Sequence, residues 1–263
     1  MKTDYGNWMP KKKIFSYLAG FAASLFFTLF ASFSDSLAAG PLKTAFIILF
    51  LLISFIFLGI ALWSIQIYKA FDPNGQRQMA KQLIDGITSY LNLPEGSTCL
   101  DVGCKSGVLA IAAAKRNPHA KVIGVVFPEK DKSSSDCSLC EQNASAEGAE
   151  NIHFQQEDPA HLSFADETFD ALIGNFAYYS IMAADRQSLL LEALRTLKKG
   201  GTFVIHDVFS VSRYGDMNAF LKKLEKMEYQ KAELIDTTDG MFMDKKEAAW
   251  MMLTGSALLK GIK

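Results

Sequence analysis

A β-favouring stretch of the chain carries an acidic residue near its end and is followed by two glycines. This stretch, Thr98 to Val102, leads into Gly103-Cys104-Lys105-Ser106-Gly107 and then into an alanine-rich segment with high helix propensity. A strand, a tight turn and a helix in this order let the backbone approach a ligand, and the free N–H groups at the start of the helix favour an anionic group. The spacing therefore predicts a ligand-binding turn.

The positions of the glycines exclude two common nucleotide motifs. A dinucleotide GxGxxG would require glycine at 103, 105 and 108, where the chain has Gly103, Lys105 and Val108. A phosphate loop that used Lys105 and Ser106 would require glycine at positions 99 and 104, and both positions hold cysteine. Neither a nicotinamide site nor a phosphate loop is predicted.

The pattern that remains is an aspartate that ends the strand, Asp101, followed by Gly103 and Gly107. It resembles motif I (DxGxGxG) of the class I S-adenosylmethionine-dependent methyltransferases, with Lys105 in place of the middle glycine. The resemblance implies that Asp101, Gly103 and Gly107 bind S-adenosylmethionine. A bare strand–turn–helix of any doubly wound sheet is the alternative, so other parts of the chain must decide.

Two further stretches resemble the same family. The block from Gly148 to Ile181 is similar to the family's segment from strand three to the aromatic residues after strand four, and the block from Leu189 to Asp207 is similar to its LRxLKPGG helix and strand five. The resemblance implies that Asp158 contacts the adenine side of the cofactor and that Asn175 and Phe176 contact it after strand four. It covers almost all of the chain after residue 71.

Strands and helices alternate along this part of the chain, which predicts an α/β fold with a doubly wound, mostly parallel sheet covered on both faces. The resemblance implies seven strands in a Rossmann-like methyltransferase fold. The expected strands are 98–102, 121–127, 152–155, 169–175, 201–208, 232–236 and 256–262, and the expected helices are 76–91, 133–147, 185–197, 216–227 and 245–252. The helix 185–197 is expected to end at Lys198-Lys199 and the two glycines that follow.

Two uncharged runs near the N-terminus, residues 14–33 and 44–67, are each long enough to span a bilayer, which takes about 20 residues. The polar segment between them contains Gly40-Pro41, so we expect a two-helix transmembrane hairpin over 14–67. The alternatives are a secretory signal peptide for the first run, with Lys11 to Lys13 as its basic flank, and two buried core helices.

Basic residues set the expected orientation of this hairpin. Four lysines precede the first run, and three basic residues follow the second run up to residue 81. Only Lys43 lies between the runs. The asymmetry places both termini in the cytoplasm. The chain is thus expected to be a multi-pass protein of the cell membrane, resembling a bacterial membrane-anchored member of the family. Its expected parts are an N-terminal segment 1–13, the hairpin 14–67 in contact with lipid, and a cytoplasmic methyltransferase-like domain 71–263.

Composition narrows the partners. A net charge of −1 and the lack of a basic aromatic stripe give no indication of nucleic-acid binding. All cysteines lie in the expected cytoplasmic part, where thiols stay reduced, so a disulfide framework is not expected. Cys137 and Cys140 form a CxxC pair without a second pair, so no metal site is expected. The sequence does not identify a protein partner.

Three positions depart from the family pattern. Val126 stands where the family has an acidic residue for the ribose hydroxyls, Lys105 stands in the glycine loop, and Glu157 replaces a glycine before Asp158. Two lost hydrogen bonds to a charged group, at roughly 1.5 to 3 kcal/mol each, would weaken binding by about a hundredfold or more. Glu129 could reach back to compensate. Two hypotheses follow: an active membrane-anchored methyltransferase, or a catalytically silent methyltransferase-like module that binds a partner or another ligand.

The acceptor side is less defined. Methyl transfer needs two aligned molecules, so no nucleophilic side chain is required, and the catalytic residues are not identified by the sequence. Tyr178, Tyr179 and His206 follow or end strands four and five, on the side expected for the acceptor, and His206 is the candidate proton acceptor. The hairpin would hold the pocket near the bilayer, which favours a small or lipid-associated acceptor.

Overall fold

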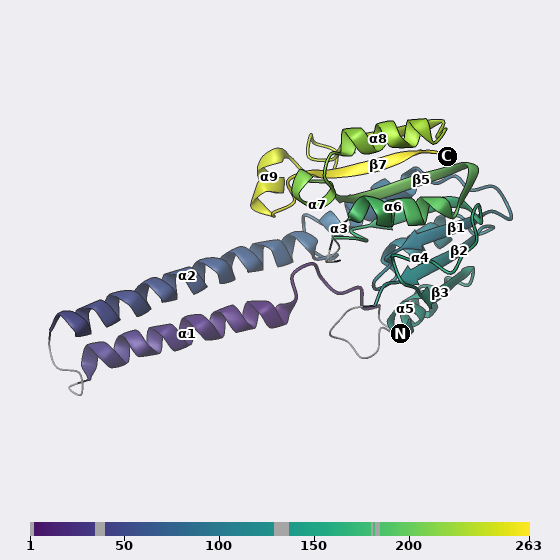
Figure 1. Cartoon of the computed structure of the whole chain (residues 1–263). Coiled ribbons are helices and arrows are strands. Elements are labelled where there is room, and N and C mark those ends of the chain that lie inside the picture. Colours follow the sequence, from purple (N-terminus) through teal and green to yellow (C-terminus); the bar gives the residue numbers. More distant parts are fainter. Residues whose placement is uncertain (1–2, 35–39, 129–136, 180, 182–184) are drawn as a thin grey trace. The chain divides into compact units, whose positions relative to one another are not determined.

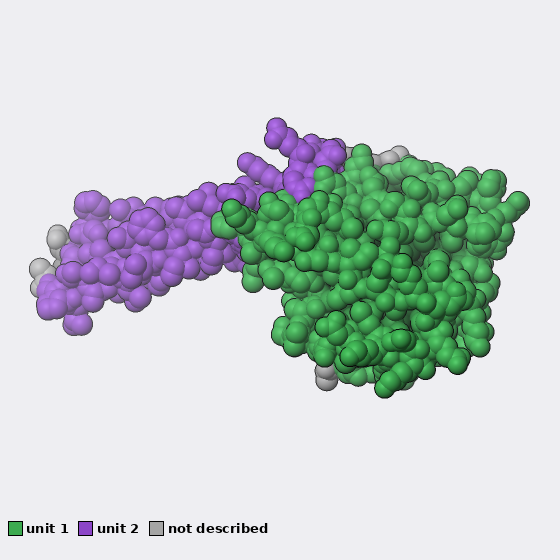
Figure 2. All heavy atoms as spheres, turned by 90° about the horizontal axis from the view of Figure 1, so that it is seen from above, with its two compact units in different colours: residues 1–5, 81–263 green, residues 6–80 purple. Residues whose placement is uncertain are grey.

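The structure is a computed structural model, and it describes residues 3–34, 40–128, 137–179, 181 and 185–263 (Figure 1). These residues form two compact units, coloured separately in Figure 2. One unit is Gly6–Ala80, and the other is Lys81–Lys263 together with residues 3–5. The inclusion of residues 3–5 differs from the predicted division, which assigned residues 1–13 to a separate segment.

The smaller unit contains two long helices, α1 (Lys11–Phe33) and α2 (Pro41–Phe71). Both are long and apolar enough to cross a membrane, judged by length and composition, and most of their surface is exposed. α1 begins three residues before the predicted range, and α2 extends beyond it at both ends, with Pro41 at its first position, where proline is favoured. The middle of the predicted turn, residues 35–39, lies outside the described residues.

The larger unit is built on a seven-stranded sheet, which confirms the predicted α/β fold. Its strand order is β3-β2-β1-β4-β5-β7-β6, and every neighbouring pair is parallel except the two that involve β7. The strands are β1 (Thr98–Val102), β2 (Lys121–Val126), β3 (Ile152–Gln156), β4 (Phe169–Asn175), β5 (Leu197–Val208), β6 (Lys231–Asp236) and β7 (Ser256–Ile262).

Helices connect these strands and cover the sheet (Figure 1). In the strand order, β2 lies on the β3 side of β1, whereas β5 lies on the β6 side of β4. The two crossovers therefore run in opposite directions, and right-handed connections place their helices on opposite faces of the sheet. The helices are α3 (Met79–Ser89), α4 (Val108–Arg116), α5 (Ser138–Glu147), α6 (Arg186–Arg195), α7 (Val211–Tyr214), α8 (Met217–Lys226) and α9 (Lys245–Trp250). The predicted start of α5, residues 133–136, lies outside the described residues.

The core explains why these segments are ordered. On one face of the sheet, Leu100 and Phe203 pack with Leu190 of α6 and Phe220 of α8, all of them buried. At about 25 cal/mol per Å² of buried apolar surface, each such side chain contributes roughly 1.5 to 3 kcal/mol. Four apolar residues of α3, Met79, Leu83, Ile84 and Ile87, are also buried, as is Leu91 just after the helix.

One predicted boundary is wrong. The sixth helix ends at Arg195, and Leu197 already pairs with Phe169, so Lys198 and the following residues belong to β5 rather than to a helix end. The reason is a tertiary contact: Lys198 Nζ lies 2.8 Å from Asp170 Oδ1 on β4. Strand pairing and this ion pair outweigh the local helix-ending signal.

The strand order reverses between β1 and β4, and ligands of open α/β sheets bind at the carboxyl ends of the strands beside such a point.

Candidate functional site

In the turn after β1, residues 103–107, every second residue has the left-handed backbone conformation that glycine favours. Gly103, Lys105 and Gly107 have φ values of 67°, 51° and 83°, all in the left-handed region. Lysine adopts this region at a cost of roughly 1–2 kcal/mol. The substitution at position 105 therefore changes the side chain and leaves the loop conformation in place.

Two of these positions also lack room for a side chain. A Cβ on Gly103 would lie 2.9 Å from Ala177 Cα and 3.1 Å from the Phe127 ring. A Cβ on Gly107 would lie 3.1 Å from the ring of Phe154. The residues that follow β2 and β4 thus lie close to the loop, as a site built on backbone requires.

Asp101 is the second-last residue of β1, just before this loop, and is 1% exposed. Neither carboxylate oxygen has a hydrogen-bond partner among the described residues. Burial raises the pKa of Asp101 well above its usual value, and the backbone N–H of Ala110 in α4 acts in the opposite direction. A buried carboxyl without a partner is costly and is characteristic of a functional site.

The thiols near the loop are free and buried. Cys140 of α5 donates its Sγ–H to the backbone oxygen of Lys105 at 2.9 Å. A hydrogen bond with Cys140, together with burial, raises the pKa of Cys104, so this thiol stays protonated. The described residues contain no group of three or more His, Cys, Asp or Glu side chains able to hold a metal ion.

The positions expected to hold the ribose and adenine differ from the family pattern in structure as well. Val126 is 8% exposed at the end of β2. Glu157 is also buried, and its carboxylate accepts from Gln155 Nε2 at 2.6 Å, from Ser163 N at 2.9 Å and from Ser163 Oγ, so it stabilises its own turn. Asp158 is exposed and caps the turn through Ala160 N at 2.9 Å. Glu129 lies outside the described residues.

The end of β4 carries a strained residue. Phe176 has a left-handed φ of 49° and is 3% exposed, with its ring 4.7 Å from the ring of His206. Strain of this kind in a bulky residue accompanies functional sites. Asn175 precedes it and is partly exposed. Phe127, whose possible role the sequence did not reveal, stacks on Tyr178 with ring centroids 5.7 Å apart.

Two of the three predicted acceptor-side residues are enclosed, so the prediction that they face an acceptor is wrong. His206 is fully buried within β5, and its ring nitrogens lie 2.8 Å from Asn175 Oδ1 and 2.7 Å from Ser256 Oγ. Burial lowers the pKa of His206 to about 3. Tyr178 is also fully buried and donates to the Leu189 oxygen at 3.3 Å. Tyr179 alone is partly exposed, with the Arg213 guanidinium 4.1 Å from its ring centre.

Asp207, which ends the motif-like block, is also satisfied internally. It accepts from Tyr214 Oη at 2.9 Å, from Tyr178 N at 3.2 Å and from Val208 N at 2.7 Å. Burial raises the pKa of Asp207, whereas these hydrogen bonds and the charge of Lys105 lower it.

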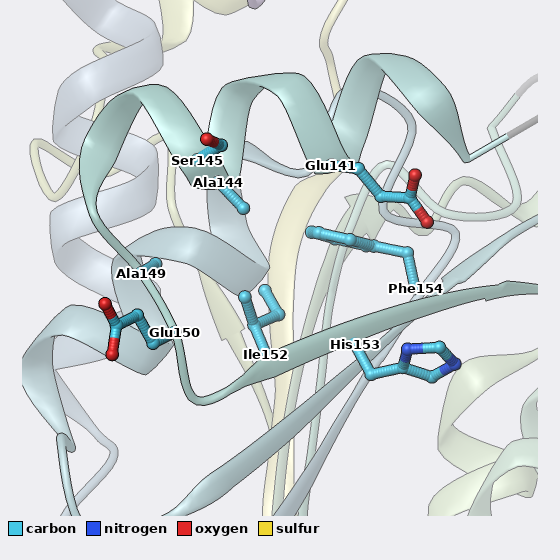
Figure 3. Close-up of a pocket in the computed structure, with 8 residues that line it drawn as sticks. All are labelled: Glu141, Ala144, Ser145, Ala149, Glu150, Ile152, His153 and Phe154. Carbon is cyan, nitrogen blue, oxygen red and sulfur yellow. The ribbon is translucent and has the colours of Figure 1, made fainter.

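A cavity of about 400 Å³ lies between α5 and β3 (Figure 3). Figure 3 shows Ile152 and Phe154 pointing from β3 towards α5 and His153 pointing away from it. The cavity contains none of the predicted site residues, and the ring of Phe154 lies next to Gly107. It is lined by Glu141, Ala144, Ser145, Ala149, Glu150, Ile152, His153 and Phe154.

The fold and the glycine-type loop define a Rossmann-like methyltransferase domain. Residues 93–255 match the family model described as a methyltransferase domain, and the chain belongs to that family. S-adenosylmethionine is the cofactor that this membership assigns to it. The residues present fit the cofactor at the loop and at Asp101, and they lack a carboxylate at the end of β2.

Curated relatives match part of the chain. An arsenite methyltransferase of Halobacterium salinarum is 29% identical over 129 residues, which is 49% of this chain and 31% of the relative. A demethylmenaquinone methyltransferase of Lactobacillus johnsonii is 34% identical over 112 residues, which is 42% of this chain and 43% of the relative. A sterol 4-C-methyltransferase of Caenorhabditis elegans is 26% identical over 160 residues, 60% of this chain and 46% of the relative. The match thus spans less than half the length of each of these relatives.

Solved structures share the fold. Geranyl diphosphate methyltransferase, in complex with geranyl diphosphate and sinefungin, has a TM-score of 0.56 at 16% identity over 74% of this chain and 82% of its own. The [4+2]-cyclase SpnF has a TM-score of 0.54 at 19% identity over 71% of this chain and 82% of its own. At these identities the similarity concerns the fold.

Proposed function

We propose that this protein is a membrane-anchored S-adenosylmethionine-dependent methyltransferase that acts on a small, lipid-associated acceptor. The observation that carries the proposal is the combination of left-handed backbone at positions 103, 105 and 107 with the unpartnered carboxyl of Asp101. Left-handed backbone at the non-glycine Lys105 and a buried carboxyl without a hydrogen-bond partner both accompany functional sites.

When bound, S-adenosylmethionine supplies an electrophilic methyl group. The protein then has to hold it and align an acceptor in line with the breaking carbon–sulfur bond, and such alignment lowers the barrier substantially. The backbone of loop 103–107 and Asp101 would hold the cofactor. His206 is neutral and enclosed, so the acceptor's proton would leave through another group or through water.

Chain connectivity supports the proposed topology. Residues 3–5, which precede α1, belong to the same compact unit as the domain that follows α2. A chain that crosses a bilayer twice, once in α1 and once in α2, returns to the side where it began. The excess of lysine and arginine outside the loop between the helices then puts both termini and the domain on the cytoplasmic side.

Two features favour a lipid-associated acceptor. Relatives are named for demethylmenaquinone and for a sterol, both strongly apolar molecules. In addition, Val211, Trp250 and Met252 are 79%, 51% and 68% exposed beside the carboxyl end of β5, where Phe209 N donates to Gly255 O at 2.8 Å. Exposed apolar side chains with a tryptophan are typical of a surface that meets lipid.

The second candidate is a catalytically silent module that binds a partner at the membrane. The buried Val126 favours it, because an apolar side chain at the end of β2 cannot bind the ribose hydroxyls. A shared fold does not fix the reaction, and SpnF, a cyclase, illustrates this.

The test uses the full-length protein in detergent or nanodiscs with S-adenosylmethionine labelled in the methyl group. Titration calorimetry is expected to show binding, and incubation with a membrane lipid extract is expected to transfer label to the organic phase. Label found only in water-soluble acceptors would contradict the lipid-associated acceptor. No binding at millimolar cofactor would favour the silent module.

A further inference from the structure

A buried asparagine connects the cofactor loop to the N-terminal segment. Asn143, on α5, is 2% exposed. Its Nδ2 donates to the backbone oxygens of Ser106 and Asp4, each at 2.9 Å, and its Oδ1 accepts from Asp4 N at 2.8 Å. The side chain therefore uses both amide hydrogens and its oxygen to join α5, the loop and residue 4.

A second connection runs directly from the loop to the N-terminal segment. Ser106 Oγ donates to the Tyr5 oxygen at 3.0 Å. Burial, together with the charge of Glu147 and a hydrogen bond with it, raises the pKa of Tyr5 to about 12, so the Tyr5 hydroxyl is held protonated beside α5. Residues 4 and 5 thus contact the loop at Ser106 and α5 at Asn143 and Glu147, which lie about one helical turn apart.

These contacts fix the orientation of the loop's peptide groups. The oxygens of Lys105 and Ser106, two consecutive residues, accept from Cys140 and Asn143 of α5. In a trans peptide the N–H points opposite to the C=O, so the Ser106 N–H points away from α5. Because Lys105 is left-handed without being glycine, the loop does not keep this conformation by local preference and depends on its neighbours.

We propose that residues 4 and 5, which belong to the same compact unit as the loop, are a working part of the cofactor site, and that Asn143 and Ser106 are positioning residues that transmit their support to the loop. The inference rests on the proposed function, because it concerns the affinity of the same loop for S-adenosylmethionine. It adds that the site is complete only when the chain's own N-terminal residues are docked, and that the residues leading into the membrane anchor thereby influence cofactor affinity.

The first test compares two asparagines of similar bonding in the full-length protein. Asn143→Ala removes the three hydrogen bonds described above. Asn151→Ala, the control, also removes three contacts, because the two hydrogens of Asn151 Nδ2 are shared among the oxygens of Ala114, Asn117 and Ala120, at 3.2, 3.0 and 2.7 Å, at the opposite end of the sheet. We expect both variants to lower Tm, and only Asn143→Ala to raise the Kd for S-adenosylmethionine, by about tenfold or more.

A second pair keeps the test valid if Asn143→Ala does not fold. Asp4 contributes its backbone N–H and oxygen to Asn143. Asp4→Pro deletes that N–H, whereas Asp4→Ala retains it. We expect Asp4→Pro to raise the Kd several-fold and Asp4→Ala, which keeps the backbone N–H, to raise it less.

The outcomes separate the inference from the proposed function. If the wild-type protein binds S-adenosylmethionine and both Asn143→Ala and Asp4→Pro bind it equally well, the inference is wrong and the proposed function stands. If Asn151→Ala raises the Kd as much as Asn143→Ala, general destabilisation explains the effect and the inference is again wrong. If the wild-type protein does not bind the cofactor, the proposed function fails, and the inference with it.

Discussion

The two halves of the sheet's carboxyl end are built in different ways. On the cofactor side, the loop after β1 is defined by backbone conformation, with left-handed residues at 103, 105 and 107 and an unpartnered Asp101. On the acceptor side, the polar residues that end β5 are bonded to their neighbours, as His206 is to Asn175 and Ser256. The difference teaches that a glycine motif reports backbone conformation reliably, whereas a polar residue type at a strand end does not show which way it faces.

The largest effect is expected from breaking the cofactor side at its tightest position. Gly103→Ala places a methyl group 2.9 Å from Ala177 Cα, so the loop must move and the Kd for S-adenosylmethionine should rise by about a hundredfold or more. Gly148→Ala is the matched control, because Gly148 has the same φ of 67° with nothing within 4 Å of the added carbon. Calorimetric titration of both variants checks this, and equal affinities would show that the loop does not carry the site.

An intermediate effect is expected from completing the cofactor side. Val126→Asp places a carboxylate where the ribose hydroxyls are expected, and we expect a roughly tenfold lower Kd, since part of the gain of about 1.5 to 3 kcal/mol per hydrogen bond offsets desolvation. Val126→Asn, which has a similar shape without the charge, should give a smaller gain. An unchanged Kd for Val126→Asp in competition binding would mean that the cofactor's ribose does not lie at the end of β2.

On the acceptor side the expected effect is on stability and leaves cofactor affinity unchanged. The pKa of His206 is about 3 in the folded state and near 6.5 when unfolded, so below pH 6.5 the unfolded chain binds the extra proton. Stability should therefore fall by about 1.4 kcal/mol for each pH unit between pH 6 and 4, with no contribution from His206 above pH 7. His206→Gln should remove this part of the pH dependence.

Urea denaturation of the wild type and His206→Gln at pH 5 and pH 7.5 measures the difference. The other histidines are common to both proteins and cancel in the comparison. The same pH dependence in both would mean that His206 is accessible and protonated in the folded protein, and the contrast between the two sides would then lose its basis.

Much of the fold was predictable, because it follows from local patterns. The strands 169–175 and 256–262 occur as predicted, and the resemblance supplied the number of strands. The end of α6 was not predictable, since it depends on strand pairing and on Lys198 meeting Asp170. Helix α7 has four residues, too few to show a helical period.

The candidate site divides in the same way. Gly103 and Gly107 were identifiable because left-handed backbone selects glycine. The burial of His206 and Tyr178 was not, since both polar side chains find partners on segments distant in sequence. Asn143 gave no signal at all, because its partner Asp4 lies 139 residues away in the sequence.

One contact in the smaller unit has a mechanical consequence. Ser54 Oγ of α2 donates to Ser24 Oγ of α1 at 2.9 Å, and both side chains are buried between the helices. Sliding one helix by a single turn, about 5.4 Å, would separate the two hydroxyls and leave each with only its bond within its own helix, from Ser24 Oγ to Gly20 O and from Ser54 Oγ to Phe50 O. In a bilayer the pair should therefore tilt and diffuse as one body rather than as two independent rods.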